Sequence, residues 1–356
     1  MKKVLLLLAA AATLAACSKT EVTPVASNEN SEITFNVAPR TKALSPTQTD
    51  FDHNNVFVSY AYYLGPDKTW AANNSEAQKY IVGSTISYDG NLWKNETTSY
   101  YWPKDGGSLT FFAYSYNKKN MTVGDNTGFT CVWEIADDGT YKGGINGHFD
   151  VANNKNVDFL VADIAADKTQ NENHYAHTGV PTLFRHRLSM VNVAANLAEN
   201  YANKKFILNS VKFIQICHYA TYNQIPEAMT PGALSDPSDQ VYAENLGFEV
   251  ESGDLKTVPA KINGDAEVED GQYIYIPQEF GEGSFIEISY TVETTVGNNI
   301  VKEECIKRVP VKDVFKQWEM GHRYTLNLTF SLNEIHWDPA VENWIDDVAG
   351  NITIDK

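Results

Sequence analysis

Cysteine is scarce in this chain of 356 residues: four are present, and no Cys-x-x-Cys pair occurs. Three of them, Cys131, Cys217 and Cys305, lie inside apolar, strand-like runs, and an odd number leaves at least one thiol unpaired within the monomer. We therefore expect these cysteines to be buried, unreactive thiols. A bridge between Cys217 and Cys305 is the alternative.

Positive charge is also in short supply. The chain has 28 Lys and Arg residues against 45 Asp and Glu residues, for a formal net charge of −17. This balance argues against nucleic acid as a partner and against an electrostatic membrane interface. It is typical of a soluble surface protein whose copies repel one another.

The chain has one long apolar run, and it is too short to cross a membrane. Residues 4–16 would span only about 20 Å as a helix at about 1.5 Å per residue, against a bilayer core of roughly 30 Å. Lys2 and Lys3 precede the run and Ala15-Ala16-Cys17 ends it, which indicates a secretory signal. A cysteine after two alanines resembles the lipobox of bacterial lipoproteins. This resemblance implies that residues 1–16 are removed and that Cys17 is lipidated; an ordinary signal peptide with a nearby cysteine is the alternative.

Motifs of catalysis and metal binding are missing as well. The sequence has no His-Glu-x-x-His, no glycine-rich phosphate loop and no Gly-x-Ser-x-Gly elbow, and its acidic clusters lack calcium-loop spacing. His174 and His177 form a His-x-x-His in a polar segment, where a solvated loop is the expectation and adventitious metal the alternative. We expect a protein that is not an enzyme and has no cofactor.

Aromatic residues are abundant, with 19 Tyr, 16 Phe and 7 Trp, and they favour strands over helices. Alternating apolar runs recur along the chain, separated by clusters of Gly, Asn, Asp and Pro. About seven runs fall in each half, which predicts an all-β fold of two tandem seven-stranded β-sandwiches with one short helix at residues 313–319. The runs span residues 32–38, 56–64, 80–86, 100–102, 109–116, 129–135, 157–162, 183–194, 206–217, 241–250, 272–276, 285–296, 300–311 and 324–332.

The same pattern divides the chain into segments. A polar stretch at residues 163–178 contains few apolar side chains and indicates a domain boundary. We predict a flexible tether at 17–31, an N-terminal sandwich at 32–175, a C-terminal sandwich at 176–335 and a C-terminal tail at 336–356.

The first strand and the segment after it form one candidate site. Ile33, Phe35 and Val37 alternate on one face of the predicted strand. A loop bracketed by two prolines follows, and it carries Arg40 and Lys42 as exposed basic residues.

The end of the chain is the other candidate site. Val348, Ile352 and Ile354 share one parity in the tail, with Gly350 between them. This alternation suits a strand that adds to another sheet, and an ordinary final edge strand is the alternative.

Two longer segments carry a family resemblance. The first reads Leu-Phe-Arg-His-Arg-Leu-Ser-Met-Val-Asn-Val at 183–193, and the second reads Trp-Glu-Met-Gly-His-Arg-Tyr-Thr-Leu-Asn-Leu at 318–328. Together with the lipobox-like start and Ile335-His336-Trp337, their order resembles the fimbrillin-type (type V) pilins, including the Mfa-like members. The resemblance covers almost all of the chain and implies sandwiches of the transthyretin-like type.

Alternation also gives these motif residues places in a scaffold. In the first segment it puts Phe184, His186, Leu188 and Met190 on one face, so we expect a hydrogen-bonded histidine and not a ligand. In the second segment Gly321 is expected to supply a turn, after which Tyr324, Leu326 and Leu328 enter the core.

The resemblance further implies a mode of assembly. Such pilins are exported as outer-membrane lipoproteins and are cut by an extracellular Arg- or Lys-directed protease, here at Arg40 or Lys42. The lost strand leaves a groove that a strand of another pilus subunit fills, here residues 348–354. The chain would then be a stalk or tip subunit of a cell-surface pilus that supports adhesion to host or bacterial surface ligands.

A surface glycan-binding lipoprotein is the alternative function. It would stay monomeric and would present an aromatic platform, for which Trp70, Trp93 and Trp102 are the candidate residues.

Overall fold

The computed structural model describes residues 31–39, 51, 53–116, 134–135, 141–142, 144–151, 158–170, 179–225, 227–232, 238–260, 272–332 and 335–343. Its regular structure is almost entirely β, which confirms the predicted all-β class. The described helices are short: α1 (Trp70–Asn73), the 3-10 turn η1 (Asn74–Glu76) and α3 (Val311–Val314). The helix predicted at 313–319 was wrong in extent, because α3 is already over at Val314 and the chain pairs again as β23 (Gln317–Trp318). No helix in the described ranges is long and apolar enough to cross a membrane.

The N-terminal half folds into a sheet that closes on itself. Its order is β10-β5-β2-β3-β4-β1-β11-β9, and an additional pairing of β9 with β5 completes a ring. Seven of these eight described strands belong to the ring, and β10 lies outside it against β5. The strands are β1 (Phe35–Pro39), β2 (Phe57–Leu64), β3 (Gln78–Tyr88), β4 (Trp93–Asn95), β5 (Ser108–Ser115), β9 (Leu160–Ala162), β10 (Ala165–Lys168) and β11 (Val180–His186).

Aromatic side chains fill one face of this closed sheet. Phe35 meets Phe57 and Phe111 edge to face, with ring centroids 5.4 Å and 5.8 Å apart. Trp93 and Trp102 belong to the same cluster. Trp70, Trp93 and Trp102 expose only 7%, 5% and 1% of their surface, so the candidate sugar-stacking platform was wrong: these rings are core residues.

The C-terminal half is a sandwich of two sheets. One has the order β18-β12-β24-β25 with β19 also on β12, and the other has the order β16-β13-β21-β22 with β17 also on β13. The bounds are β12 (Ser189–Leu197), β13 (Lys204–Ile216), β16 (Ser238–Ala243), β17 (Phe248–Val250), β18 (Lys256–Val258), β19 (Gln272–Tyr275), β21 (Phe285–Val296), β22 (Asn299–Pro310), β24 (His322–Phe330) and β25 (Ile335–Asn343).

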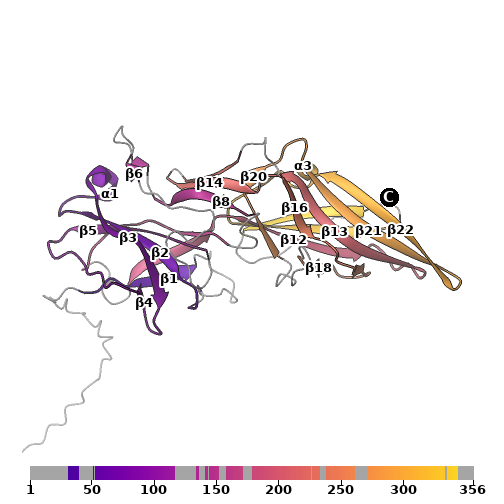
Figure 1. Cartoon of the computed structure of the whole chain (residues 1–356), viewed down its shortest axis with the longest axis horizontal. Coiled ribbons are helices and arrows are strands. Elements are labelled where there is room, and N and C mark those ends of the chain that lie inside the picture. The colour runs from indigo at the N-terminus through magenta and orange to yellow at the C-terminus, as the bar shows by residue number, and fades with distance from the viewer. Residues whose placement is uncertain are drawn as a thin grey trace, which may run out of the picture.

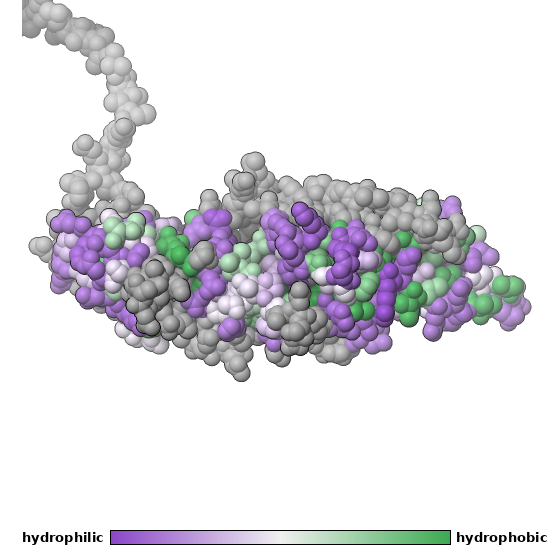
Figure 2. Space-filling model, turned by 90° about the horizontal axis from the view of Figure 1, so that it is seen from above, coloured by the Kyte–Doolittle hydropathy of each residue, from purple (hydrophilic) through white to green (hydrophobic). Residues whose placement is uncertain are grey.

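The molecule is elongated (Figure 1), with the N-terminal sheet at one end and the free end of the β21–β22 hairpin at the other. Apolar residues are exposed at that hairpin end, where Val296, Ile300 and Val301 each expose more than half of their surface. Figure 2 shows apolar surface at the same end of the molecule.

A junction layer lies between the two halves (Figure 1). It contains the three-stranded sheet β15-β14-β8 and the short pair β20–β23. The strands are β8 (Asn146–Asp150), β14 (Tyr219–Gln224), β15 (Glu227–Pro231) and β20 (Gln278–Glu279). β8 from the first half pairs with β14 from the second, and β11, which follows the predicted boundary at 175/176, pairs in the N-terminal sheet. A further two-stranded pair consists of β6 (Glu134–Ile135) and β7 (Tyr141–Lys142).

Two of the predicted strands are each split in the structure. The run at 183–194 is divided into β11 and β12, which belong to different sheets. The break falls at Arg187, whose N–H donates to Phe159 O, and Leu188, whose carbonyl accepts from Gly321 N. The run at 241–250 is divided between β16 and β17, with Asn245 and Gly247 at positive φ between them.

The predicted roles of His186 and of residues 321–328 are confirmed. The single face predicted for Phe184, His186, Leu188 and Met190 was wrong, because Phe184 packs in the cluster of Phe35 whereas Leu188 packs in a different cluster. His186 is half-buried, and its Nδ1 lies 2.9 Å from Asp158 Oδ2. Gly321 has φ +68° and forms the turn before β24. Tyr324, Leu326 and Leu328 are buried in the C-terminal core.

The cysteine predictions divide. Cys217 is buried, as expected, and forms no disulfide bond; its thiol lies 3.4 Å from the Gly232 carbonyl. Cys305 forms no disulfide bond either, so the alternative bridge between the two was wrong. Cys131 lies outside the described residues. Cys305 is half-exposed because it lies on β22, an edge strand of its sheet.

Buried tyrosines in the C-terminal core should make stability fall at high pH. Burial raises the pKa of Tyr273 to about 12, so the folded state favours the neutral phenol. This contribution to stability is complete below the ordinary tyrosine pKa of about 10 and is lost as the pH rises toward 12. Tyr273→Phe should therefore reduce the loss of unfolding free energy between pH 10 and 12, as measured by urea titration. The exposed Tyr101→Phe is the control, and an equal alkaline loss in both variants would contradict this expectation.

Candidate subunit interface

The first strand occupies a slot in the closed N-terminal sheet. β1 pairs in parallel with β11 over five residue pairs, from Phe35 with Val180 to Pro39 with Phe184. On its other side β1 meets β4 through the pairing of Phe35 with Trp93. β1 is therefore the strand that joins β4 to β11 in the ring.

Backbone hydrogen bonds extend the slot beyond the N-terminal end of β1. Ile33 N donates to Tyr100 O at 2.7 Å, and Trp102 N donates to Ser31 O at 3.1 Å. On the opposite side Val180 N donates to Thr34 O at 2.7 Å. The segment 31–39 is thus bonded to both neighbours, and its removal would leave unpaired groups on two strands.

The apolar side chains of this segment point into the N-terminal core. Ile33 and Phe35 expose 2% and 3% of their surface, and Val37 packs against the same cluster. Asn36, between them, is exposed. The predicted face of Ile33, Phe35 and Val37 is therefore the core-facing one.

Gly179 makes the close approach of β1 possible. It has φ +83°, and a Cβ at this position would lie 2.6 Å from the carbonyl carbon of Phe35 and 2.8 Å from its nitrogen. A residue with a side chain would therefore collide with the backbone of β1 and would also be strained at this φ. Sequence analysis missed this residue.

Gly179→Ala should weaken the docking of β1 without removing any apolar side chain. We expect the segment 31–39 to exchange its amide hydrogens at least tenfold faster than in the native chain, because the added methyl displaces its backbone. Hydrogen exchange with mass spectrometry measures this directly. Gly90→Ala is a matched control, since Gly90 also has positive φ (+103°) but has no atom within 4 Å of an added Cβ. Equal exchange of segment 31–39 in the two variants would show that the close contact is unimportant.

The other predicted site residues lie outside the described ranges. These are the lipidation residue Cys17, the cleavage residues Arg40 and Lys42, the donor residues Val348, Ile352 and Ile354, and the pair His174 and His177. The last described residue, Asn343, lies five residues before the predicted donor residue Val348. β25 is antiparallel to β24 in the C-terminal sandwich, and Asn343 lies opposite His322 at the junction end of that hairpin.

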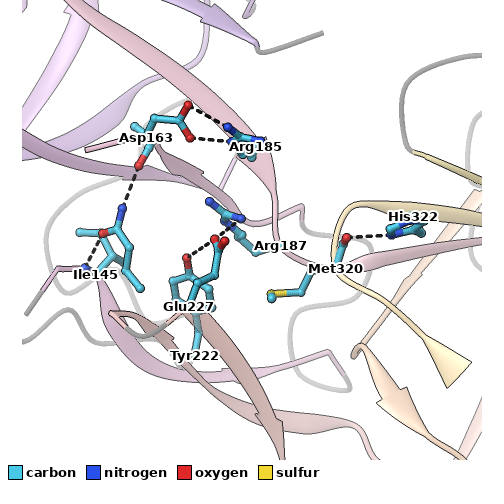
Figure 3. Close-up of polar contacts among 10 residues, drawn as sticks. Ile145, Asp163, Arg185, Arg187, Tyr222, Glu227, Met320 and His322 are labelled. Carbon is cyan, nitrogen blue, oxygen red and sulfur yellow. Dashed lines mark hydrogen bonds and ion pairs between the residues drawn. The ribbon is translucent and has the colours of Figure 1, made fainter. Parts of the chain in front are cut away.

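A polar network fastens the N-terminal sheet to the junction layer (Figure 3). Arg185 on β11 binds Asp163 through two hydrogen bonds, of 2.5 Å and 3.0 Å, and this contact raises the pKa of the guanidinium. Gln224 on β14 donates to Ala162 O at 2.9 Å and accepts from Ile145 N at 2.8 Å. Three separate chain segments are therefore bonded together at this point.

Arg187 forms the second part of this network. It is 6% exposed, pairs with Glu227 on β15 and lies 5.8 Å from the centroid of the Tyr222 ring. Burial raises the pKa of Tyr222, which therefore stays neutral and donates to Glu227 at 3.4 Å. Because the Glu227 side chain is about half exposed, solvent screens this ion pair and it contributes less than a fully buried pair would. The contact links the end of β11 to β15 of the junction layer.

The described residues offer little for catalysis. No group of three or more His, Cys, Asp and Glu side chains in these ranges could hold a metal ion. The half-buried histidines pair with single acids, as His218 Nδ1 does with Asp150 at 2.9 Å, and complete local hydrogen bonds.

Comparison with known proteins identifies a family. The fimbrillin-like family model matches residues 41–344. The chain belongs to the fimbrillin-like family.

Individual relatives of this fimbrillin-like chain are distant in sequence. The fimbrium subunit Fim1C of Phocaeicola vulgatus is 23% identical over 99% of both chains. A fimbrial protein from Bacteroides vulgatus has the same fold, with a TM-score of 0.65 at 18% identity over 88% of this chain and 99% of the other. A putative cell adhesion protein from Bacteroides uniformis gives a TM-score of 0.49 at 14% identity, over 88% and 100% of the two chains.

Proposed function

We propose that this chain is a structural subunit, stalk or tip, of a cell-surface pilus that supports adhesion, and that it is assembled by strand exchange after proteolysis. One observation carries the proposal: β1 closes the N-terminal sheet, and Arg40 and Lys42 follow it directly in the sequence. A single cut at either residue would separate β1 from the rest of the chain.

The empty slot would be a strong binding site for another strand. Ile33 and Phe35 are almost fully buried, and side chains of this size contribute roughly 1.5–3 kcal/mol each when buried. Unpaired N–H and C=O groups on β4 and β11 would add a further cost until a new strand bonds to them. A strand with apolar residues at every second position would bury its side chains in the slot and pair with these backbone groups, which is β-augmentation.

The part of the predicted C-terminal tail that follows β25, residues 344–356, would supply such a strand; this part is called the tail below. Thirteen residues follow Asn343, and among them Val348, Ile352 and Ile354 repeat the parity of Ile33, Phe35 and Val37. The tail lies after the last described strand of the subunit's own sandwich, so its loss to a neighbour would leave that sandwich paired. Cleavage makes the exchange one-way, because the departed strand is no longer covalently attached.

Export precedes assembly in this scheme. Cys17 would carry the lipid that holds the precursor in the outer membrane, and two or three acyl chains give an almost irreversible anchor. An extracellular Arg- or Lys-directed protease would then remove the anchor together with β1. The partners are other pilus subunits of the same or a different kind, and surface ligands of a host or of other bacteria. The proposal includes no catalytic step.

Limited trypsin digestion of the purified mature chain tests this function. A pilus subunit should be cut after Arg40 or Lys42, lose the segment that contains β1 and then form oligomers. Mass spectrometry reports the cut and size-exclusion chromatography reports the oligomers. A chain that is cut there and stays monomeric, or that keeps β1 bound, would show that the slot does not exchange.

A further inference from the structure

A groove lies at the junction end of the C-terminal sandwich. Its volume is about 700 Å³, and it is bordered by β15, by the β20–β23 pair and by residues next to these strands. Apolar side chains form much of its wall: Met229, Pro231, Pro277, Trp318 and Met320. Met229 and Met320 are only partly buried, so flexible thioether side chains line an accessible surface.

The polar residues of the floor are already satisfied. Gln278 is buried; its Oε1 accepts from Cys217 N at 2.8 Å, and its Nε2 donates to Cys217 O at 2.9 Å and to Ile276 O at 3.0 Å. The amide of Gln278 is therefore already used within the protein, and the polar group of the wall that lacks a hydrogen-bond partner is the buried Trp318 Nε1, a donor. An apolar segment of polypeptide, whose backbone carbonyls can accept a hydrogen bond, is the occupant that fits this wall.

The C-terminal tail begins beside this groove. Asn343 lies opposite His322, and His322 Nδ1 lies 3.0 Å from the carbonyl oxygen of Met320, which lines the groove (Figure 3). The last described residue before the tail is therefore next to the short stretch of chain that leads from the groove into β24.

We propose that the groove binds the start of the tail of the same chain, with Trp344 and Ile345 as the side chains that enter it. Trp344 and Ile345 are the first two residues after Asn343 and are both apolar. Aromatic contacts with methionine sulfur are favourable, which suits Trp344 against the groove wall. The inference goes beyond the proposed function and depends on it only in treating the tail as a donor strand.

Length is compatible with this occupant. Thirteen residues at about 3.3 Å each span at most about 43 Å, so an anchor at the groove holds the whole tail close to its own subunit. Glu279 and Glu319 border the groove and are exposed, and they repel the carboxylates of Asp346 and Asp347. The proposal therefore requires these two acidic side chains to face solvent while Trp344 and Ile345 enter the groove.

This contact would hold the donor strand in place before assembly. A tail bound at its base has fewer conformations, and Val348, Ile352 and Ile354 stay near the subunit until an open slot is presented. Release of Trp344 and Ile345 should therefore make the donor strand available sooner.

Hydrogen exchange of the uncleaved mature chain tests the proposal, because β1 is in place and no polymer is needed. In the native chain, amides of residues 344–347 should exchange at least tenfold more slowly than in the double variant Trp344→Ser with Ile345→Ser. The groove segments 227–232 and 317–320 should lose protection in the same variant. Met320→Ser should release the tail equally, and adding it to the tail variant should have no further effect. Val301→Ser, which alters an exposed apolar residue outside the groove, is the control.

Two results would overturn the proposal. One is a native tail that exchanges as fast as in the tail variant. The other is a protected tail with unchanged groove segments, since the tail would then be bound elsewhere. The tail variant alters no described residue, so it decides the question even if Met320→Ser is unstable.

The rate of polymerisation distinguishes a failure of this inference from a failure of the proposed strand exchange. The double variant keeps Val348, Ile352 and Ile354, so after trypsin cleavage it should polymerise several-fold faster than the native chain. An unchanged rate would refute the role of the groove in holding the donor strand. If neither chain polymerises, the proposed assembly by strand exchange is wrong. The hydrogen-exchange data still decide whether the groove binds the tail.

Discussion

Subunits in which Arg40 and Lys42 are both replaced by alanine should fold normally and fail to accept a donor strand. Without a cleavage site in this loop, β1 stays covalently attached. It then returns to its slot far faster than a strand from another molecule can enter, because its effective concentration there is high. The buried Ile33 and Phe35 and the bonds to β11 hold it in place.

Protease treatment followed by size-exclusion chromatography measures this effect. Oligomers should fall from the main product to a trace, while circular dichroism and the thermal midpoint stay at their native values. The matched control is Lys79→Ala with Lys104→Ala, which removes two exposed basic residues from the same half of the chain and leaves the loop intact. Normal oligomers from the uncleavable variant would mean that the slot opens without proteolysis.

The sequence predicts the site well where the signal is local. Alternation within the first strand identified Ile33, Phe35 and Val37 as one face, and these side chains do enter the N-terminal core. Gly179 could not be found in this way. Its function depends on the approach of Phe35, which is distant in the sequence, and no local pattern reports such a contact.

The division of residues 183–194 between two sheets did leave a signal in the sequence pattern. The buried positions are even-numbered in β11, at Val180, Thr182 and Phe184, and odd-numbered in β12, as at Val191 and Val193. A change of parity inside an apolar run means that the strand must change faces or end. The predicted single strand overlooked this change, which falls at Arg187 and Leu188.

The junction layer was beyond sequence reasoning for a different reason. β8 and β14 pair although some seventy residues separate them, as between Phe149 and Ala220. Both are short, and the free energy that orders them comes from packing against distant residues and not from their own propensity. The tryptophans show the same limit, because composition alone does not distinguish a buried ring from an exposed one.

Deletion of residues 348–356 should give a folded subunit that accepts a donor strand but cannot act as one. The last described strand, β25, stays paired with β24 in this variant, so the subunit's own sandwich keeps its described strands. Ile352→Asp with Ile354→Asp should have the same effect, since a charge in an apolar slot costs several kcal/mol. Loss of long polymers after protease treatment, with an unchanged circular dichroism spectrum, is the expected result.

Mixing the two defective subunits gives the sharpest test, because each fails at the opposite side of the same contact. The cleaved, tail-deleted subunit has an open slot and no donor, whereas the Arg40→Ala, Lys42→Ala subunit has a donor and a closed slot. Together they should form one-to-one dimers and no longer species, as sedimentation or light scattering would show. Each variant alone should remain monomeric, which serves as the control. If tail-deleted subunits still polymerise alone, the donor lies elsewhere in the chain; if they are unfolded, the tail belongs to the subunit's own core.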